Sequence, residues 1–295
     1  MLNEIKVTSI LNKHKKRDDW FLGNYTLNPY AGCPFNCIYC YTRGSKYGGD
    51  HGSEVALKEN AVFMLKRQLK NRIKMGERGF IVLGSAAEAY PPIERNLRAT
   101  REILFLIKRY KFPVHICTKS NLILRDLDIL KEINRDAILP DDLKEKLGRG
   151  VLISFSLSTL NEELASILEP RAPSPMERLE TMKKCSDMGF KVGVINMPVL
   201  PFLSDSNNDL EAMIKAAKIH GAEYIIFSGL TLYGDGPEDC KTLYYQFLEN
   251  HFPQMVPEYK KLFSGSFAPS KHYQMDLARR YREISAKYGV KNRII

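Results

Sequence analysis

The stretch Asn28-Pro-Tyr-Ala-Gly-Cys-Pro-Phe-Asn-Cys-Ile-Tyr-Cys40 carries three cysteines within eight residues, at Cys33, Cys37 and Cys40. Their spacing is C-x3-C-x2-C, and an aromatic residue, Tyr39, stands just before the last cysteine. Three thiolates on one short loop are able to bind a single metal centre. An iron–sulfur cube usually takes four cysteine ligands, so a cube held by these three keeps one iron free for another ligand. The stretch therefore predicts a cluster at which chemistry takes place.

Zinc and disulfide bonds are the other uses of clustered cysteines. A zinc site takes four ligands, commonly from two separated cysteine pairs, and the only nearby candidate for a fourth ligand here is His51. A secreted disulfide framework is disfavoured, because Cys117, Cys185 and Cys240 are scattered singly along the chain. A zinc-binding protein without enzymatic activity stays as the alternative to the cluster.

The cysteine spacing resembles the cluster loop of the radical S-adenosylmethionine (SAM) enzymes, which also place an aromatic residue before the third cysteine. The resemblance implies a [4Fe-4S] cluster whose open iron chelates the amino and carboxylate groups of SAM. It also implies that one electron cleaves SAM into methionine and a 5′-deoxyadenosyl radical, which abstracts hydrogen from a substrate. An electron donor such as flavodoxin or ferredoxin is the partner that this chemistry requires.

Composition limits the class of protein and suggests a partner. The chain has 295 residues, with 44 Lys and Arg against 34 Asp and Glu, which gives a net charge of +10. This excess permits a polyanionic partner such as nucleic acid. The segment 1–12 lacks a long apolar core and the longest apolar runs have the length of strands, so we expect a cytoplasmic protein without a membrane span.

Strands and helices alternate along most of the chain, which predicts a parallel sheet with helices outside. Apolar runs predict strands at 25–30, 80–84, 113–118, 150–157, 190–200 and 223–228. Helical periodicity predicts helices at 55–73, 93–110, 125–134, 161–168, 175–188 and 205–220. Six units do not close an eightfold barrel. They match the partial (β/α)6 TIM-type barrel that the resemblance to radical SAM enzymes implies.

The expected organisation has three parts. An N-terminal extension covers residues 1–23, the barrel covers 24–230, and a helical C-terminal extension covers 231–295. Helices expected at 257–263 and 271–288 should cover the open side of the barrel.

Three further stretches narrow the resemblance. They are similar to segments of the radical SAM subgroup related to spore photoproduct lyase, also called DNA-repair-photolyase-like. The three stretches are Leu83-Gly-Ser-Ala-Ala-Glu-Ala-Tyr-Pro-Pro-Ile-Glu94, Ile116-Cys-Thr-Lys-Ser120 and Glu169-Pro-Arg-Ala-Pro-Ser-Pro175. The subgroup implies DNA or another nucleic acid as substrate, and a peptide or small metabolite is the alternative. The lyase keeps a hydrogen-donor cysteine where this chain has Ser85, so the resemblance does not extend to the lyase's own hydrogen donor.

Site residues are expected at the carboxyl ends of the strands, where such folds place their chemistry. By resemblance, Lys119 meets the SAM carboxylate through a charge-assisted hydrogen bond. The resemblance and the strand-end rule suggest contacts with other parts of SAM for Tyr39, Ser85, Glu88, Ser156 and Ser158. Glu169 and Arg171 either contact the cofactor or form a structural ion pair.

A hydrogen donor is needed if the product must be re-hydrogenated. Cys117 lies two residues before Lys119 on an expected strand, and alternation places both side chains on one face. Tyr41 or Tyr90 would bridge the remaining distance to the substrate. The alternative is that Cys117 is a small core residue, as buried free cysteines commonly are.

Overall fold

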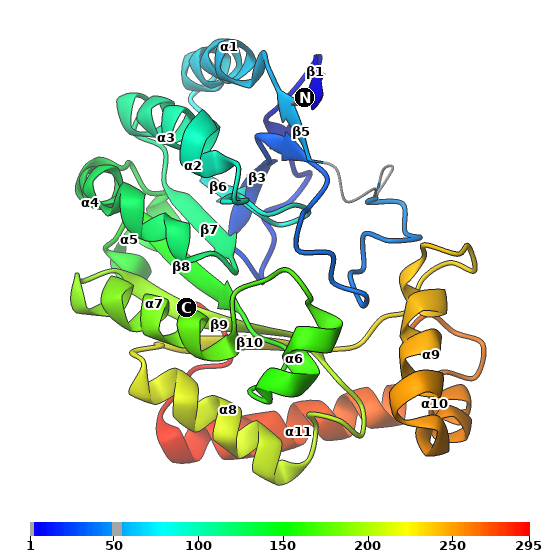
Figure 1. Ribbon diagram of the computed structural model, residues 1–295. Helices are drawn as coiled ribbons and strands as arrows, with labels where there is room; N and C mark the ends of the chain where they lie inside the picture. Colours follow the sequence, from blue (N-terminus) through cyan, green and yellow to red (C-terminus); the bar gives the residue numbers. More distant parts are fainter. Residues whose placement is uncertain (1–2, 49–54) are drawn as a thin grey trace.

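A central sheet positions every other part of the molecule (Figure 1). The computed structural model describes residues 3–48 and 55–295, and within them this sheet has seven strands in the spatial order β10-β9-β8-β7-β6-β3-β2. Its strands are β2 (Asn12–Lys13), β3 (Gly23–Leu27), β6 (Phe80–Leu83), β7 (Val114–Thr118), β8 (Val151–Ser156), β9 (Lys191–Val199) and β10 (Tyr224–Gly229).

The sheet winds in one direction as a partial barrel. From β3 to β10 each strand lies parallel to its predecessor in this series, and β2 adds an antiparallel edge. Among the described residues β10 does not pair with β3, so the barrel stays open. The α/β fold class, with six parallel strands in a partial barrel, is confirmed.

The helices of the described residues lie around the sheet, most of them on its outer side, while two near the C-terminus pack beside the cysteine loop (Figure 1). They are α1 (Ala61–Lys74), α2 (Glu94–Leu97), α3 (Ala99–Arg109), α4 (Leu127–Asp136), α5 (Asp141–Leu147), α6 (Glu162–Leu168), α7 (Pro175–Asp187), α8 (Asn207–Ile219), α9 (Cys240–His251), α10 (Val256–Phe263) and α11 (Lys271–Tyr288). Two 3-10 turns, Asn121–Asp126 and Pro253–Met255, precede α4 and α10.

Both faces of the central strands are buried, as in parallel sheets covered by helices. All four residues of β6 are buried. The outward side chains Ile81 and Leu83 belong to the large core beneath the helices. The inward side chain Val82 belongs to a small cluster with Cys117 and Ile195 inside the barrel. Alternation along the strands thus separates the core from the residues that face the barrel interior.

Helix α5 was not predicted, and it closes the end of the barrel away from the strands' carboxyl ends. Its side chains Leu143 and Leu147 pack with Phe80, Leu152 and Tyr224. The helix has only seven residues, which is too short for periodicity to reveal it. Its position depends on contacts with strands that are distant in sequence.

The predicted helix at 55–73 is wrong in its first turn. Strand β5 (Ala56–Lys58) pairs with β1 (Asn3–Ile5) and β4 (Tyr30–Ala31) in a second, small sheet, and the helix begins at Ala61. The helical pattern of apolar residues includes residues 56–58, but their backbone groups form hydrogen bonds with β1 and β4 instead of within a helix.

The predicted helix at 93–110 is broken in two at Arg98, which has a left-handed backbone with φ 55°. The buried Glu94 carboxylate accepts a hydrogen bond of 3.0 Å from the backbone amide of Thr100, which lies in the first turn after the break. This bond caps the first turn of α3. The helix predicted at 125–134 also begins later, because residues before Leu127 form a 3-10 turn.

The sequence predicted that the C-terminal helices cover the open side of the barrel. In the structure they pack in two separate places. Helix α11 joins the outer layer, where the Tyr281 ring stacks on Phe227 of β10 with 3.9 Å between ring centres. Helices α9 and α10 instead pack beside the cysteine loop, with Phe247 and Phe263 in one cluster with Phe35. Whether residues 231–295 form a unit of their own stays a prediction.

No helix in the described part of the chain has the length and apolar character needed to cross a membrane.

Candidate functional site

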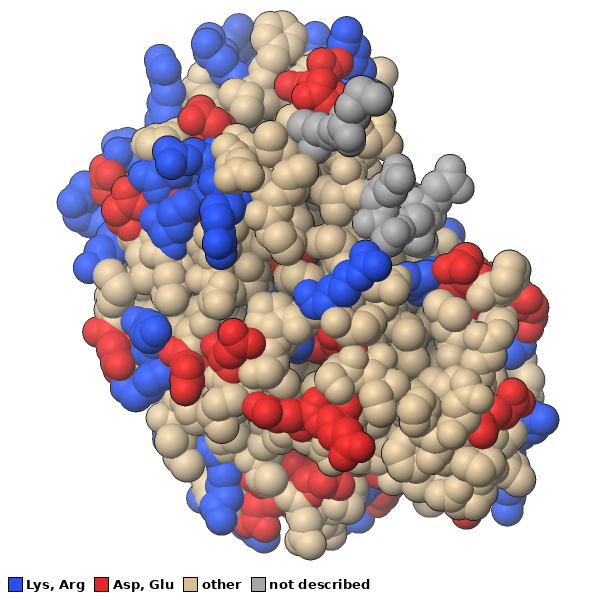
Figure 2. Space-filling view, viewed as in Figure 1, with Lys and Arg blue, Asp and Glu red and all other residues tan. Residues whose placement is uncertain are grey.

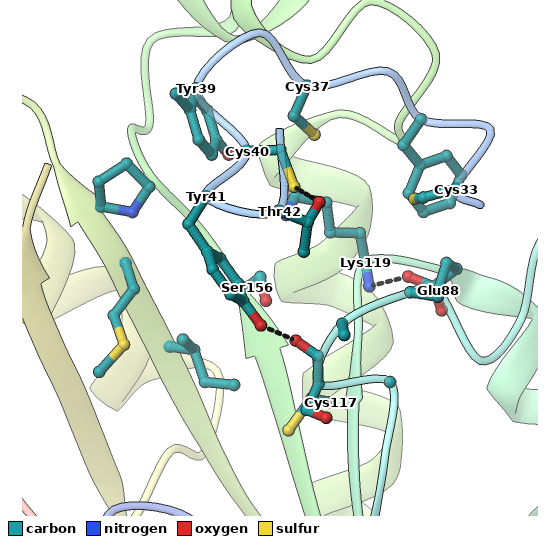
Figure 3. A pocket seen from close by; sticks show the side chains of 18 of the residues that line it. Cys33, Cys37, Tyr39, Cys40, Tyr41, Thr42, Glu88, Cys117, Lys119 and Ser156 are labelled. Atoms are coloured by element: carbon teal, nitrogen blue, oxygen red, sulfur yellow. Dashed lines mark hydrogen bonds between the residues drawn. The ribbon is translucent and has the colours of Figure 1, made fainter. Parts of the chain in front are cut away.

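A cavity of about 390 Å³ opens at the carboxyl ends of the parallel strands (Figure 3). The cysteine loop forms one wall, and the ends of β6 to β10 form the others. Its lining includes ten of the side chains expected to act, namely Cys33, Cys37, Tyr39, Cys40, Tyr41, Ser85, Glu88, Cys117, Lys119 and Ser156. Segments that lie far apart in the sequence thus meet at one place.

The three clustered cysteines all face this cavity. The loop that carries them is anchored by a backbone hydrogen bond of 3.0 Å from Ile38 to Leu168. Burial raises the pKa of the Cys33 thiol to about 11, and that of the Cys37 thiol further above its usual range. Thiols in such surroundings stay protonated in water, and a bound metal displaces their protons, so this donor set fits a thiolate-ligated cluster.

The same cysteines do not form a compact site for one ion. Within residues 3–48 and 55–295, no group of three His, Cys, Asp or Glu side chains converges closely enough to hold a single metal ion. His51, the fourth ligand considered for zinc, lies outside the described residues.

Glu88 and Lys119 provide the charged groups of the cavity wall. The Glu88 carboxylate is buried and already accepts hydrogen bonds from the Thr118 hydroxyl, the Lys119 backbone amide and the Tyr90 backbone amide. Burial raises the pKa of Glu88 despite these donors. Glu88 therefore braces the turn after β6 against the end of β7.

The Lys119 ammonium points toward the cysteine loop, with 6.0 Å between its Nζ and the centre of the Tyr39 ring. In the described part of the chain, this Nζ makes no hydrogen bond or ion pair. Burial by itself lowers the pKa of Lys119, but the charge of Cys37 in its thiolate form and that of the Glu169 carboxylate outweigh burial and leave the pKa raised. The site thus presents a protonated cation that is available to an anionic ligand.

Tyr39 lines the cavity, while Ser158 and Glu169 lie behind it. The Tyr39 hydroxyl donates to the Glu169 carboxylate, and the Ser158 hydroxyl donates to the same carboxylate at 3.0 Å. The carboxylate also pairs with Arg178. An ion pair between Glu169 and Arg171 is therefore wrong, since Arg178 takes that place and Arg171 is exposed. Ser158 and Glu169 hold Tyr39 from outside the cavity wall.

Cys117 and Lys119 both face the cavity, as strand alternation predicted. The Tyr41 hydroxyl donates a hydrogen bond of 2.8 Å to the Ser85 carbonyl, and Figure 3 shows its ring reaching toward the part of the cavity where Cys117 lies. Tyr90, in contrast, lies in the core beneath the helices and does not line the cavity.

Sequence reasoning missed His115, which continues the inward face of β7 below Cys117. Its Nδ1 lies 2.9 Å from the Phe21 carbonyl, and its Nε2 lies 2.7 Å from the Ser154 hydroxyl and 3.9 Å from the Cys117 sulfur. Burial lowers the pKa of His115 to about 4. Because a carbonyl only accepts, Nδ1 carries the proton of the neutral ring. Alternation along residues 115, 117 and 119 was the signal that could have found it.

The wall opposite the polar residues is apolar, and its members also escaped the sequence analysis. Phe21 comes from the segment before β3, Ile195 and Met197 come from β9, and Pro198 follows them. None of these side chains carries a charge. The cavity thus combines a polar half near the cysteines with an uncharged half on the β9 side.

Comparison with known proteins identifies the family. A family model described as the radical SAM superfamily matches residues 27–217. An uncharacterized protein of Mycobacterium tuberculosis is 27% identical over 271 residues, which cover 90% of this chain and 74% of that protein. An uncharacterized protein of Methanocaldococcus jannaschii is 31% identical over 185 residues, which cover 61% of this chain and 62% of that protein.

Solved structures with the same fold include spore photoproduct lyase. A point mutant of this lyase has a TM-score of 0.69 at 14% identity, and the match covers 98% of this chain and 80% of that one. The lyase complexed with dinucleoside spore photoproduct has a TM-score of 0.67 at 14% identity and covers 98% and 81%. At this identity the likeness concerns the fold alone. Because the family model spans more than half of the sequence, including the cysteine loop, the chain belongs to the radical SAM superfamily.

Proposed function

We propose that this radical SAM enzyme acts on a nucleic acid, from which it removes a hydrogen atom. Membership of the family brings a [4Fe-4S] cluster and SAM as cofactors. One observation carries the proposal. In the part of the chain that the structure describes, the cavity has cysteines and the Lys119 ammonium on one side and an uncharged wall on the other. The first side suits an anionic cofactor, and the second suits a neutral part of a substrate.

The polar half supplies the cofactor contacts. Cys33, Cys37 and Cys40 would hold the cluster, and Lys119 would bind the SAM carboxylate through a charge-assisted hydrogen bond. When bound, the cluster and SAM supply a 5′-deoxyadenosyl radical, with the electron coming from a flavodoxin or ferredoxin.

The surrounding polar residues orient SAM and Lys119. Tyr39, Ser85 and Ser156 line the same half of the cavity and contact the adenosine part of SAM. Glu88 already accepts three hydrogen bonds, so its role is to position the backbone of Lys119 rather than to bind SAM. Ser158 and Glu169 act through Tyr39, and Arg171 is not required.

The uncharged half receives the reacting part of the substrate. A phosphate or carboxylate placed against Ile195, Met197 and Phe21 would lose its hydration without a partner. A nucleobase or its sugar meets no such penalty, and its phosphates stay at the mouth. Apolar walls also keep water away from the reacting atoms, which protects a radical from side reactions.

Cys117 is the proposed source of a hydrogen atom where the product needs one. The transfer passes through Tyr41: its O–H bond breaks as a C–H bond forms on the substrate radical, and the phenoxyl radical takes the hydrogen atom of the Cys117 S–H bond. The thiyl radical that remains is then reduced by one electron from the enzyme's electron donor and by one proton. Tyr41 reaches toward this part of the cavity and bridges the gap, whereas Tyr90 in the core does not take part.

The surface supports a polyanionic substrate. Arg95 and Arg98 on and after α2 follow the segment that lines the cavity, and both are exposed. Figure 2 shows basic side chains gathered over the region of α2 and α3, with acidic ones over α6. Within the described residues, neither arginine forms an ion pair. Exposed unpaired arginines bind phosphates without discriminating between sequences.

A binding experiment tests the substrate class. Single-stranded and duplex DNA and RNA are titrated at two salt concentrations with wild type, with Arg95→Ala/Arg98→Ala, and with the control Lys184→Ala/Lys218→Ala on α7 and α8. Each phosphate contact adds about 0.9 to the salt slope, so the arginine variant should lose up to about 2 units of slope. An unchanged slope would remove the arginines from the interface. Absence of binding at low salt would favour a peptide or small metabolite.

A further inference from the structure

The Arg43 side chain ties the cysteine loop to the C-terminal part of the chain. Arg43 lies three residues after Cys40, and its guanidinium is buried although it carries a charge. One terminal nitrogen donates to the Asn36 side-chain oxygen, and the other donates to the Glu238 backbone carbonyl at 3.1 Å. The two ends of the guanidinium therefore hold two segments that are about two hundred residues apart in sequence.

Asn36 is the point at which the loop turns between two cluster cysteines. It lies between Cys33 and Cys37 and has a left-handed backbone with φ 55°. Asparagine is one of the few residues other than glycine that adopt this conformation, and its side chain can receive a contact that supports the turn. Arg43 provides it from the other end of the loop, where its own backbone amide donates to the Cys40 carbonyl at 2.9 Å. The side chain thus closes a bridge across the whole cysteine stretch.

The partner segment, residues 231–239, is itself well fixed. The Tyr233 ring stacks on Phe267 with 4.9 Å between ring centres, and the Leu232 amide donates to the Phe267 carbonyl at 2.7 Å. Gly44, next to Arg43, has φ 78°, and a Cβ atom there would lie 2.7 Å from the Tyr233 carbonyl oxygen. The chain after the cysteines therefore fits closely against this segment.

Charge pairing does not explain the contact. The Glu238 carboxylate lies 3.4 Å from the guanidinium and is 79% exposed. Such an exposed pair contributes little to stability. The partners that matter are the Asn36 amide oxygen and the Glu238 backbone carbonyl, which a planar guanidinium reaches in two directions at once.

We propose that Arg43 is a positioning residue for the cluster, which sets the shape of the cysteine loop by joining Asn36 to segment 231–239. The C-terminal part of the chain is then part of the cluster-binding unit. The inference rests on the family's cluster and does not depend on the proposed nucleic-acid substrate. It concerns geometry, and Arg43 touches neither SAM nor the substrate.

Four variants separate geometry from charge. Arg43→Ala removes both bonds, and Arg43→Lys keeps the charge but loses the forked geometry. Asn36→Gly keeps the left-handed turn and removes only the bond to Arg43. Glu238→Ala removes the exposed carboxylate and keeps the carbonyl. Arg101→Ala is the control, because Arg101 is a half-buried arginine that pairs with Asp126 and Asp128 and does not line the cavity.

Two measurements follow the loop with and without its cofactor. In the cluster-free protein, amide hydrogen exchange of the loop peptides is read by mass spectrometry. In the loaded protein, the rate of iron release to a chelator is read from the loss of visible absorbance. Arg43→Ala, Arg43→Lys and Asn36→Gly should each raise both rates roughly tenfold, as expected for losing hydrogen bonds to a buried charged group. Glu238→Ala and Arg101→Ala should leave both rates near the wild-type values.

Thermal unfolding and a double variant complete the test. The double variant Arg43→Ala/Asn36→Gly should be no worse than Arg43→Ala alone, because Arg43→Ala already removes the bond to Asn36. Additive effects in the double variant would overturn the proposal. The proposal would also be overturned if Arg43→Ala and Arg101→Ala raised the two rates equally for the same loss of thermal stability. Arg43 would then be a general stabilising residue.

Discussion

The phenol of Tyr39 donates a hydrogen bond to the carboxylate of Glu169, which lies 130 residues further along the chain. Tyr39 belongs to the cysteine loop, and Glu169 follows α6 after β8. The same carboxylate pairs with Arg178, and both side chains of that pair are 1% exposed. A residue that faces the cofactor cavity is therefore held by a buried ion pair on the far side of the cavity wall.

Replacing Glu169 by Gln should destabilise the protein by about 3–5 kcal/mol, because Arg178 would stay buried without its counter-charge. Urea unfolding of the cluster-free protein measures the effect. Asp187→Asn, which removes the exposed pair between Lys183 and Asp187, should change stability by less than about 1 kcal/mol. A similar loss of unfolding free energy in both variants would show that the buried pair contributes no more to stability than the exposed pair.

The same carboxylate should make stability depend on acid. Burial alone raises the pKa of Glu169, but Lys119 and Arg178 outweigh it, so the pKa lies below its ordinary value of 4.5. A lowered pKa in the folded state means that the stabilisation is complete above the unfolded value and is lost as the pH falls through the folded value. Wild type should therefore lose stability below about pH 4.5 more steeply than Glu169→Gln, as urea midpoints at a series of pH values will show.

Cys37→Ala should abolish the cluster while the barrel stays folded. Wild type purified without oxygen should be brown and contain about one four-iron cluster per chain. The variant should lose the colour, the iron and the acid-labile sulfide, with an unchanged circular dichroism spectrum. Cys185→Ala is the control, because Cys185 lies in the helix core. Iron retained in the Cys37 variant would remove this residue from the ligand set.

Lys119→Ala should weaken SAM binding roughly tenfold or more, because it removes a charge-assisted hydrogen bond in a partly dry site. Equilibrium binding of SAM to the unreduced cluster measures this without turnover. Iron content should stay at the wild-type level, which separates the loss of SAM affinity from loss of the cluster. Wild-type affinity in the variant would leave the Lys119 ammonium without a role in SAM binding.

Cys117→Ala should uncouple SAM cleavage from product formation. SAM should still be cleaved, because Cys117 is not a cluster ligand, but the product per SAM cleaved should fall or a side product should appear. Measuring 5′-deoxyadenosine and altered nucleotides in one reaction gives this ratio. A normal ratio would instead indicate that Cys117 is a small core residue beside Val82 and Ile195.

Much of the site could be predicted from sequence, because strand alternation and local spacing place its residues. The C-x3-C-x2-C spacing brings three thiols to one loop, and alternation places Cys117 and Lys119 on one face of β7. Tyr90 shows where this reasoning ends. Tyr90 and Glu88 both follow β6 in a loop, where strand alternation no longer applies. The Tyr90 ring enters the core instead of the cavity.

Residues that depend on long-range contacts could not be predicted. Arg178 replaces Arg171 as the partner of Glu169 because the turn into α7 brings it next to the carboxylate. Phe21 reaches the cavity from a segment before the first parallel strand, and no local pattern marks it. Helix α5 and the break at Arg98 likewise depend on packing and on the buried Glu94 cap.

The sequence by itself determined the chemistry and the class of fold. Cysteine spacing brings three thiols to one loop, and the alternation of buried strands with amphipathic helices defines a partial β/α barrel, since both are local properties of the sequence. Only the tertiary structure decided which polar groups are available. Glu88 is occupied by three donors while the Lys119 ammonium faces the cysteines, and Arg43 joins the cysteine loop to segment 231–239. Hydrogen-bond partners and burial are properties of neighbours in space, which the order of residues along the chain does not give.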